Sequence, residues 1–166
     1  MNPSPSAILP TDHAISCENR YLVFALGSEC YAIPVEFVIE IVSWEAPTPI
    51  PEVPLFVIGV INLRGRVVPV IDARLRFGID PVDYNDRTCI VVVQSEEILL
   101  GMIVDTVRDV RDIPANLIEP PPRIGDTGVN RFIRGLAKLE EDITVILDSG
   151  ALLTPEYTGA AQLPHD

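Results

Sequence analysis

The chain has 166 residues, enough for one domain or for two small lobes that share a core. Hydrophobic residues make up 48% of it and charged residues 22%, so we expect a folded globular protein. The 24 acidic and 12 basic residues give a net charge of −12, which opposes binding to nucleic acid or to an anionic membrane surface.

The termini and the cysteines favour a cytoplasmic protein. Residues 1–19 lack the basic start and long apolar core of a signal peptide, and no apolar run reaches the roughly 20 residues that span a bilayer. The three cysteines, Cys17, Cys30 and Cys89, have no metal-ligand spacing, and an odd number does not suggest a disulfide framework. Residues 1–19 and 154–166 are rich in small residues and proline, and we expect them to be mobile tails.

Between these tails the sequence predicts four β-hairpins, each made of two β-rich runs joined by a short polar loop. The four loops lie at residues 27–29, 64–65, 95–97 and 140–142. Short helical turns are expected after Pro34, after Asp72 and at residues 114–117. Four hairpins and 16 prolines favour small barrels over a layered α/β sheet, so we expect an all-β fold of two small barrels sharing an apolar seam.

The second and fourth hairpins share a residue frame. At an offset of 76 (135 minus 59), the residues Gly59, Leu63, Val67, Val70, Ile71 and Asp72 correspond to Gly135, Leu139, Ile143, Ile146, Leu147 and Asp148. A weaker match at an offset of 69 (104 minus 35) relates Val35, Val38, Glu40 and Ile41 to Val104, Val107, Asp109 and Val110. Two copies of such a long period indicate a duplicated subdomain, with units at about 21–77 and 88–153, rather than a solenoid. Chance similarity between aliphatic-rich strands is the alternative.

Positions shared by the two copies are expected to serve the fold. Gly59 would permit close strand approach, Leu63 would fill the core of its lobe, and Asp72 would cap the turn that follows. Their counterparts Gly135, Leu139 and Asp148 would do the same in the second copy.

Positions that differ between the copies are free to carry function. Asn62, Arg64 and Gly65 of the first copy stand where the second has Lys138, Glu140 and Glu141. Alternation along residues 38–42 places Glu40 on the face opposite Ile39 and Ile41, and Glu40 is the natural partner of Arg64. The alternative is that this pair only ties parts of the fold together.

Four arginines, Arg64, Arg66, Arg74 and Arg76, fall in one short stretch. Such a patch suits bidentate capture of carboxylates on a partner. The competing interpretation is a solvated strand face without a partner.

The stretch "GVINLRGRVVPVID", preceded by "VIEIV" and followed by "VDYNDRTCIVVV", resembles the CheW-like family of chemosensory adaptors. The resemblance covers residues 20–153, which would form one CheW-like domain. It implies two SH3-like, five-stranded β-barrel subdomains with short helices around a shared hydrophobic core. It also implies that the protein has no enzymatic activity and no cofactor.

The resemblance also implies partners. They are the cytoplasmic tip of a transmembrane chemoreceptor, the regulatory domain of a CheA-type histidine kinase, and other CheW-like domains, without nucleic acid or membrane insertion. The protein would be cytoplasmic and recruited to membrane-associated receptor arrays. Residues at the family's receptor-contact positions, or supporting them, are Val38, Glu40, Asn62, Arg64, Gly65, Thr88 and Cys89. The alternative is a paralogue that serves a non-flagellar pathway such as pilus motility, or that competes with the main adaptor.

Other function classes find little support. Both histidines, His13 and His165, lie in the expected tails, so neither provides a general base inside the fold. The acidic loop residues Asp83, Asp86, Glu96 and Glu97 are expected to be solvated rather than to bind a metal. The ten aromatic residues are scattered and form no stacking platform for single-stranded nucleic acid.

Overall fold

The computed structural model describes residues 19–121 and 130–153, and the expected tails lie outside these ranges except for Asn19. The described residues form strands joined by short turns, with two α-helices of four residues each. The strands are β1 Arg20–Leu26, β2 Glu29–Pro34, β3 Val38–Ser43, β4 Val57–Leu63, β5 Arg66–Asp72, β6 Cys89–Ser95, β7 Ile98–Val104, β8 Thr106–Asp112, β9 Ile118–Glu119, β10 Ile133–Leu139 and β11 Asp142–Leu147. The helices are α2 Ala73–Arg76 and α3 Ser149–Leu152, and the 3-10 turns are η1 Val35–Phe37, η2 Ala115–Leu117 and η3 Asn130–Phe132.

All four predicted hairpins are present, as β1–β2, β4–β5, β6–β7 and β10–β11. β4 and β10 alternate buried and more exposed residues, whereas β1, β6 and β7 are continuous buried runs. Each turn is short enough to fix the pairing register. In the β4–β5 turn, Arg64 and Gly65 have φ of 53° and 84°, the pattern of a type I′ turn. The three predicted helical turns are also present, as η1, α2 and η2.

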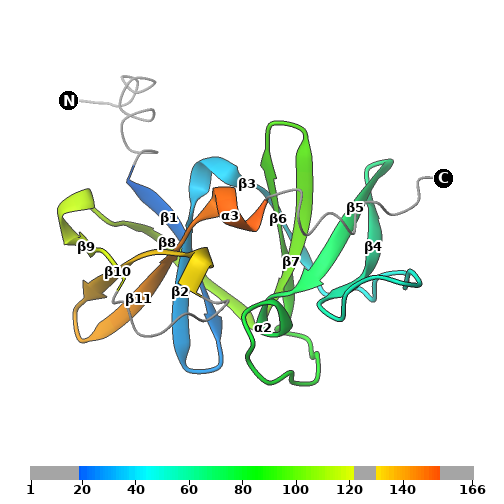
Figure 1. Cartoon of the computed structure of the whole chain (residues 1–166), viewed down its shortest axis with the longest axis horizontal. Coiled ribbons are helices and arrows are strands. Elements are labelled where there is room, and N and C mark those ends of the chain that lie inside the picture. The colour runs from blue at the N-terminus through cyan, green and yellow to red at the C-terminus, as the bar shows by residue number, and fades with distance from the viewer. Residues whose placement is uncertain (1–18, 122–129, 154–166) are drawn as a thin grey trace.

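The strands form two sheets, which we call lobe A and lobe B (Figure 1). Lobe A has the order β8-β1-β2-β11-β10-β9, and lobe B has the order β3-β6-β7-β5-β4. An isolated bridge from Thr48 to Val60 extends lobe B beyond β4. The predicted all-β class is confirmed, although lobe A carries the two-residue β9 as a sixth strand. Each lobe combines strands from both halves of the chain, because β3 pairs with β6 and β8 pairs with β1.

The strand pairs have register shifts, and these recur at the sequence offsets of 69 and 76 residues described above. The pairing of β1 with β8 shifts between Val23 and Phe24, and that of β6 with β3 shifts between Val92 and Val93. The β4–β5 and β10–β11 hairpins shift just before Gly59 and Gly135. These coincidences are what an internal duplication would produce, and the duplication itself stays a prediction.

One hydrophobic core joins the two lobes. Phe24 and Tyr31 of lobe A stack at 5.9 Å between ring centroids, and Tyr31 lies 5.8 Å from Phe77, which follows α2. Phe132 of η3 completes the row at 5.6 Å from Phe77. Buried aliphatic residues of β6, β7 and β11 surround these rings. The predicted shared core is thus confirmed. Each lobe also has a smaller hydrophobic cluster of its own.

Two arginines of the predicted patch serve this junction instead of a partner. Arg74 donates from Nε and Nη2 to both carboxylate oxygens of Asp105, at 2.9 and 2.6 Å, and its side chain is 11% exposed. The guanidinium of Arg76 lies over the rings of Phe56 and Phe132, at 4.2 and 4.6 Å. The predicted carboxylate-capturing patch of four arginines is therefore wrong for these two.

Candidate partner-binding site

The predicted Glu40–Arg64 pair is present. Nη1 of Arg64 donates to Oε1 of Glu40 at 2.6 Å, joining the β4–β5 turn to β3. β3 and β4 stand at the two ends of the order of lobe B, so this pair bridges the edges of the sheet. The Arg64 side chain is 72% exposed and that of Glu40 is 28% exposed. A charged pair this open to water remains available to a second carboxylate or guanidinium.

The turn itself is held by Asn62. Its Oδ1 accepts a hydrogen bond from the Gly65 backbone N–H at 2.8 Å. The left-handed conformation of Arg64 is a property of the hairpin, because Glu140 at the corresponding position of β10–β11 has φ of 57°. What distinguishes the first turn is therefore the chemistry of its side chains, with an arginine where the second has a glutamate.

The outer face of β3 is apolar on both sides of Glu40. The strand alternates as expected, with Val38, Glu40 and Val42 half-buried, but the residues turned to solvent are Ile39 at 44% and Ile41 at 43% exposure. Sequence alternation separates the two faces without saying which one faces the core. Ile39 and Ile41 are therefore two exposed isoleucines on an edge strand, and they form a small apolar surface on the face of β3 opposite the Glu40 side chain.

The two remaining predicted residues lie elsewhere. Thr88 is buried, and its Oγ1 accepts from the backbone N–H of Asn85 at 2.9 Å, so its side chain holds the loop before β6. Cys89 pairs with Ser43, the last residue of β3, whereas Glu40 pairs with Val92, and Cys89 packs against the shared core, as Val38 does. The structure thus brings together Glu40, Arg64 and the Asn62–Gly65 turn. Val38 and Cys89 instead pack against the shared core, and Thr88 holds the loop before β6.

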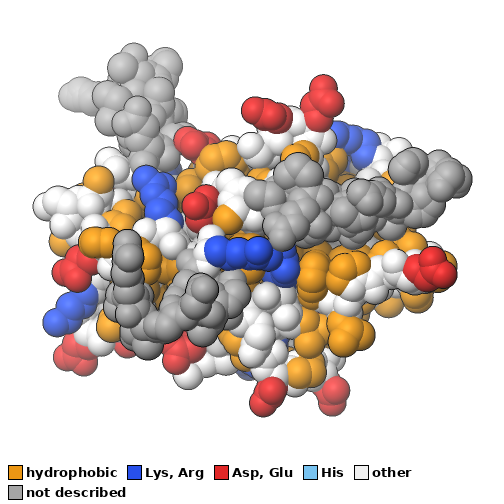
Figure 2. All heavy atoms as spheres, in the orientation of Figure 1, with side chains coloured by type: hydrophobic (Ala, Val, Ile, Leu, Met, Phe, Trp, Pro, Cys, Tyr) orange, Lys and Arg blue, Asp and Glu red, His pale blue; other side chains and the backbone are white. Residues whose placement is uncertain are grey.

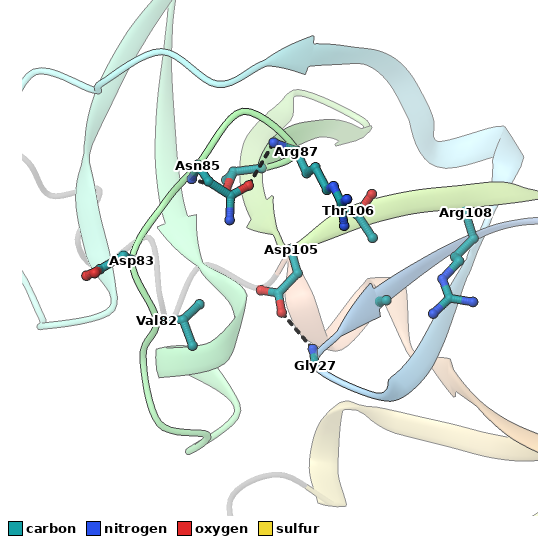
Figure 3. A pocket seen from close by; sticks show the side chains of 10 residues that line it. Gly27, Val82, Asp83, Asn85, Arg87, Asp105, Thr106 and Arg108 are labelled. Atoms are coloured by element: carbon teal, nitrogen blue, oxygen red, sulfur yellow. Dashed lines mark hydrogen bonds between the residues drawn. The ribbon is translucent and has the colours of Figure 1, made fainter.

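A cleft of about 330 Å³ lies where the lobes meet (Figure 3). Gly27, Thr106 and Arg108 line one side of it, and the other side is lined by the loop residues Val82, Asp83, Asn85, Arg87 and Thr88. At its floor, Oδ2 of Asp105 accepts from the Gly27 backbone N–H at 2.6 Å. The hydrogen bonds from Arg74 hold the pKa of Asp105 below its usual value. Asp105 is thus a fixed anion that joins the β1–β2 turn to α2.

The loop before β6 is anchored by Tyr84. Its hydroxyl donates to Oδ2 of Asp72 at 2.6 Å, and its ring lies 4.3 Å from that of Trp44. Burial, together with this hydrogen bond, raises the pKa of Tyr84 above its usual value. The hydroxyl therefore stays protonated and serves as a donor within the fold.

The described ranges contain no group of three His, Cys, Asp or Glu side chains arranged as metal ligands. In the same ranges, no helix has the length and apolar content required to cross a membrane.

Comparisons with known proteins agree with this architecture. A family model described as the CheW-like domain matches residues 20–156. The chain is 36% identical to "Chemotaxis protein CheW" of Klebsiella aerogenes, with 82% of each chain covered. It is 31% identical to "Protein FrzA" of Myxococcus xanthus, over 70% of this chain and 72% of that protein. The crystal structure of the scaffolding protein TtCheW from Thermoanaerobacter tengcongensis superposes with a TM-score of 0.72 and 38% identity, covering 78% of this chain and 88% of that one.

Proposed function

The chain belongs to the CheW-like family of chemotaxis adaptor proteins, and from this premise we propose that it couples transmembrane chemoreceptors to a CheA-type histidine kinase. The receptor would contribute its cytoplasmic tip and the kinase its regulatory domain. Other CheW-like domains are a third class of partner. The protein would then be recruited to receptor arrays at the membrane.

The observation that carries this proposal is the exposed Arg64, held by Glu40 of β3, on a strand that also exposes Ile39 and Ile41 on its other face. The two isoleucines offer an apolar contact for one face of an amphipathic helix. Arg64, with most of its side chain in water, can pair with an acidic group at the edge of that helix. Val38, Asn62, Gly65, Thr88 and Cys89 would support this contact by fixing β3, the turn and the loop before β6.

The rigidity of the two lobes suits a coupling role. An adaptor must present separate surfaces in a fixed relation, and the core shared between the lobes holds them together. The exposed apolar area on β3 is small, so each contact would be weak by itself. Many linked copies in an array would give the combined contacts their strength.

A second candidate is an adaptor for a pathway other than flagellar chemotaxis, such as pilus motility, or a competitor of the main adaptor. The similarity to FrzA, a relative whose name lies outside the CheW series, supports this candidate. Both candidates use the same surface and differ in the receptor and kinase that occupy it.

The Arg64→Ala variant tests the proposal. The measurement is how much of a receptor cytoplasmic fragment and of the kinase regulatory domain it captures, compared with wild type. We expect the variant to melt within about 4 °C of wild type, because an exposed ion pair contributes at most about 1 kcal/mol. We expect it to lose most of its capture of one or both partners. Arg134→Ala, which removes another exposed arginine, is the matched control and should capture both.

Two outcomes contradict the proposal. If Arg64→Ala is folded and captures both partners like wild type, Arg64 makes no partner contact. If the variant is unfolded, the Glu40–Arg64 pair serves the fold, and the interpretation of it as a contact fails.

A further inference from the structure

The cleft between the lobes is bordered by two arginines that have no carboxylate partner in the described part of the chain. Arg87 lies in the loop before β6, Arg108 lies on β8, and both residues are exposed. Neither guanidinium makes a hydrogen bond or an ion pair with another described residue. The arginines that do pair with a carboxylate are Arg20, Arg64, Arg74 and Arg111. Two unpaired guanidinium groups at one cleft, in a chain with twice as many acidic as basic residues, are available to an anion from outside.

The carboxylates of this cleft compete little for the two arginines. Both oxygens of Asp105 accept from Arg74, so the charge of Asp105 is already balanced within the fold. Figure 3 shows the carboxylate of Asp83 directed away from Arg87 and Arg108. With Arg74 included, three arginines and two aspartates leave this region a net charge of +1 (3 minus 2), although the chain as a whole carries −12.

Neutral hydrogen-bond donors line both walls of the cleft. Oδ1 of Asn85 accepts from the Arg87 backbone N–H at 2.7 Å, which leaves the amide N–H groups of the Asn85 side chain free to donate. On the opposite wall, the hydroxyl of Thr106 has no hydrogen bond to any described residue. Figure 3 shows the Arg87 side chain extended from the loop toward β8, where Thr106 and Arg108 lie. Donors thus reach the cleft from both lobes.

The size and the donors of the cleft favour one class of ligand. Its volume of about 330 Å³ lies at the lower end of the range of small-molecule sites, about 300–1,000 Å³. A carboxylate is planar and is satisfied by one guanidinium. A phosphate group has several strong acceptor oxygens that point in different directions, and it therefore matches donors placed on two walls.

We propose that this cleft binds a small phosphate-bearing anion, with Arg87 and Arg108 as its charged ligands. Arg87 holds the anion from lobe B and Arg108 holds it from lobe A, while Asn85 and Thr106 donate to the remaining oxygens. The bound anion joins the loop before β6 to β8 and stabilises the junction between the lobes. The inference does not rest on the proposed function, because binding requires neither a receptor nor a kinase.

Isothermal titration calorimetry of the full chain with inorganic pyrophosphate tests the proposal. The titration is made without divalent metal ions, which bind pyrophosphate themselves, and at a constant ionic strength near 0.1 M. Wild type should bind with a Kd of about 1 mM or less. Saturating pyrophosphate should also raise its melting midpoint by about 3 °C or more, because the ligand binds only the folded protein.

Replacement of the two arginines identifies the site. Arg87→Gln and Arg108→Gln should each raise the Kd about tenfold, the usual effect of losing one charged hydrogen-bond donor, and the double variant should show no binding. All three should melt within about 2 °C of wild type without ligand, because both side chains are exposed. Arg66→Gln/Arg134→Gln removes the same charge from exposed positions outside the cleft, and its Kd should stay within about twofold of wild type.

Two further titrations distinguish the source of the phosphate. ADP should bind about as tightly as pyrophosphate if the phosphate groups alone are recognised, and more tightly if the ligand is a nucleotide; both results support a phosphate site. Succinate, a dicarboxylate, should bind at least about tenfold more weakly than pyrophosphate.

Three results overturn the proposal. The first is a wild type that binds neither pyrophosphate nor ADP at about 10 mM. The second is a folded double variant that binds like wild type, or a control variant that loses as much affinity as the double variant. The third is succinate binding as tight as that of pyrophosphate. Capture of receptor and kinase fragments without added anion is measured separately, so the proposed function can fail or stand independently.

Discussion

Arginine side chains in this protein differ in role according to what their surroundings offer. Arg64 stands at the tip of a turn, where water competes with its single carboxylate partner. Arg74 is nearly buried and donates to both oxygens of Asp105 and to the carbonyl of Asp80. Arg76 packs its guanidinium on two aromatic rings. Loss of Arg64 should therefore weaken binding of a partner, whereas loss of Arg74 or Arg76 should lower the stability of the fold.

The Arg74–Asp105 pair gives a prediction about pH. Asp105→Asn should lower the free energy of unfolding at pH 7 by about 2–3 kcal/mol, because a largely buried guanidinium loses its charged partner. The folded-state pKa of Asp105 lies below the unfolded value, so its contribution is complete above about pH 4 and is lost as the pH falls through the folded-state pKa. The difference between the variant and wild type should therefore be constant from pH 7 to 5 and shrink below pH 4.

Urea unfolding at a series of pH values measures this difference. Asp83→Asn, which removes an exposed carboxylate from the lining of the same cleft, should stay within about 0.5 kcal/mol of wild type. A difference for Asp105→Asn that persists undiminished at pH 3 would show that the charge of Asp105 is not what stabilises the junction.

At the scale of elements, the β4–β5 hairpin with α2 and the β10–β11 hairpin with α3 each have an aspartate N-cap, but the surroundings of the two caps differ. Oδ1 of Asp72 accepts from two backbone N–H groups of α2, while Oδ2 accepts from Tyr84. Asp148 caps α3 through one hydrogen bond, to the Ala151 N–H. Asp72 therefore also anchors the loop before β6, in addition to capping α2.

Asp72→Ala should consequently be more harmful than Asp148→Ala. Loss of the second cap should cost about 1 kcal/mol, the usual effect of an N-cap. Loss of the first should cost about 2–3 kcal/mol, because it also leaves the half-buried Tyr84 hydroxyl without an acceptor. Chemical denaturation of both variants measures the difference, and equal losses would contradict the role assigned to the Tyr84–Asp72 hydrogen bond.

The frame glycines give a further prediction. A Cβ on Gly59 would lie 2.2 Å from the Thr48 carbonyl oxygen, and a Cβ on Gly135 would lie 2.6 Å from the Glu119 carbonyl oxygen. Either substitution by alanine must displace backbone, and we expect a loss of about 2 kcal/mol or more. Gly150→Ala is the control, since its nearest contact, Oδ1 of Asp148 at 3.3 Å, belongs to a side chain and the change should stay within about 1 kcal/mol. Thermal melts of the three variants would contradict this expectation if they coincided.

The hairpins could be predicted from sequence because their signals are local. Alternating apolar residues and the Arg64-Gly65 turn lie within one short segment, and the frame shared with Gly135 marks the close approach of a neighbouring strand. The Glu40–Arg64 pair was predictable because alternation and the difference between the two copies both pointed to it.

The prediction of a carboxylate-capturing patch is wrong for Arg74 and Arg76 because their partners within the fold are distant in sequence. Asp105 is 31 residues from Arg74, and Phe132 is further still from Arg76. Alternation on β3 likewise predicts that Glu40 lies on one face and Ile39 and Ile41 on the other. It does not predict which face is turned to solvent, because that depends on the strands packed against β3.

At the scale of the whole molecule, exchange of strands between the halves makes the two lobes depend on each other. β3 leaves lobe A after β2 and completes lobe B beside β6, while β8 leaves lobe B after β7 and completes lobe A beside β1. The aromatic row from Phe24 to Phe132 crosses the junction between them. Unfolding of β3 or β8 would therefore disrupt one lobe and expose part of the shared core. The two lobes thus form one rigid body rather than two hinged ones, as an adaptor requires.

Cooperative unfolding is the measurable consequence. Trp44, the single tryptophan, lies next to Tyr84 in lobe B, so its fluorescence reports on that lobe, whereas far-UV circular dichroism reports on both. The two signals should give the same melting midpoint in wild type. Gly135→Ala, which perturbs only lobe A directly, should lower both midpoints together by about 4–8 °C for a loss near 2 kcal/mol. If the variant lowers the circular dichroism midpoint while the Trp44 midpoint stays in place, the lobes unfold separately, and the shared core does not couple them as its packing implies.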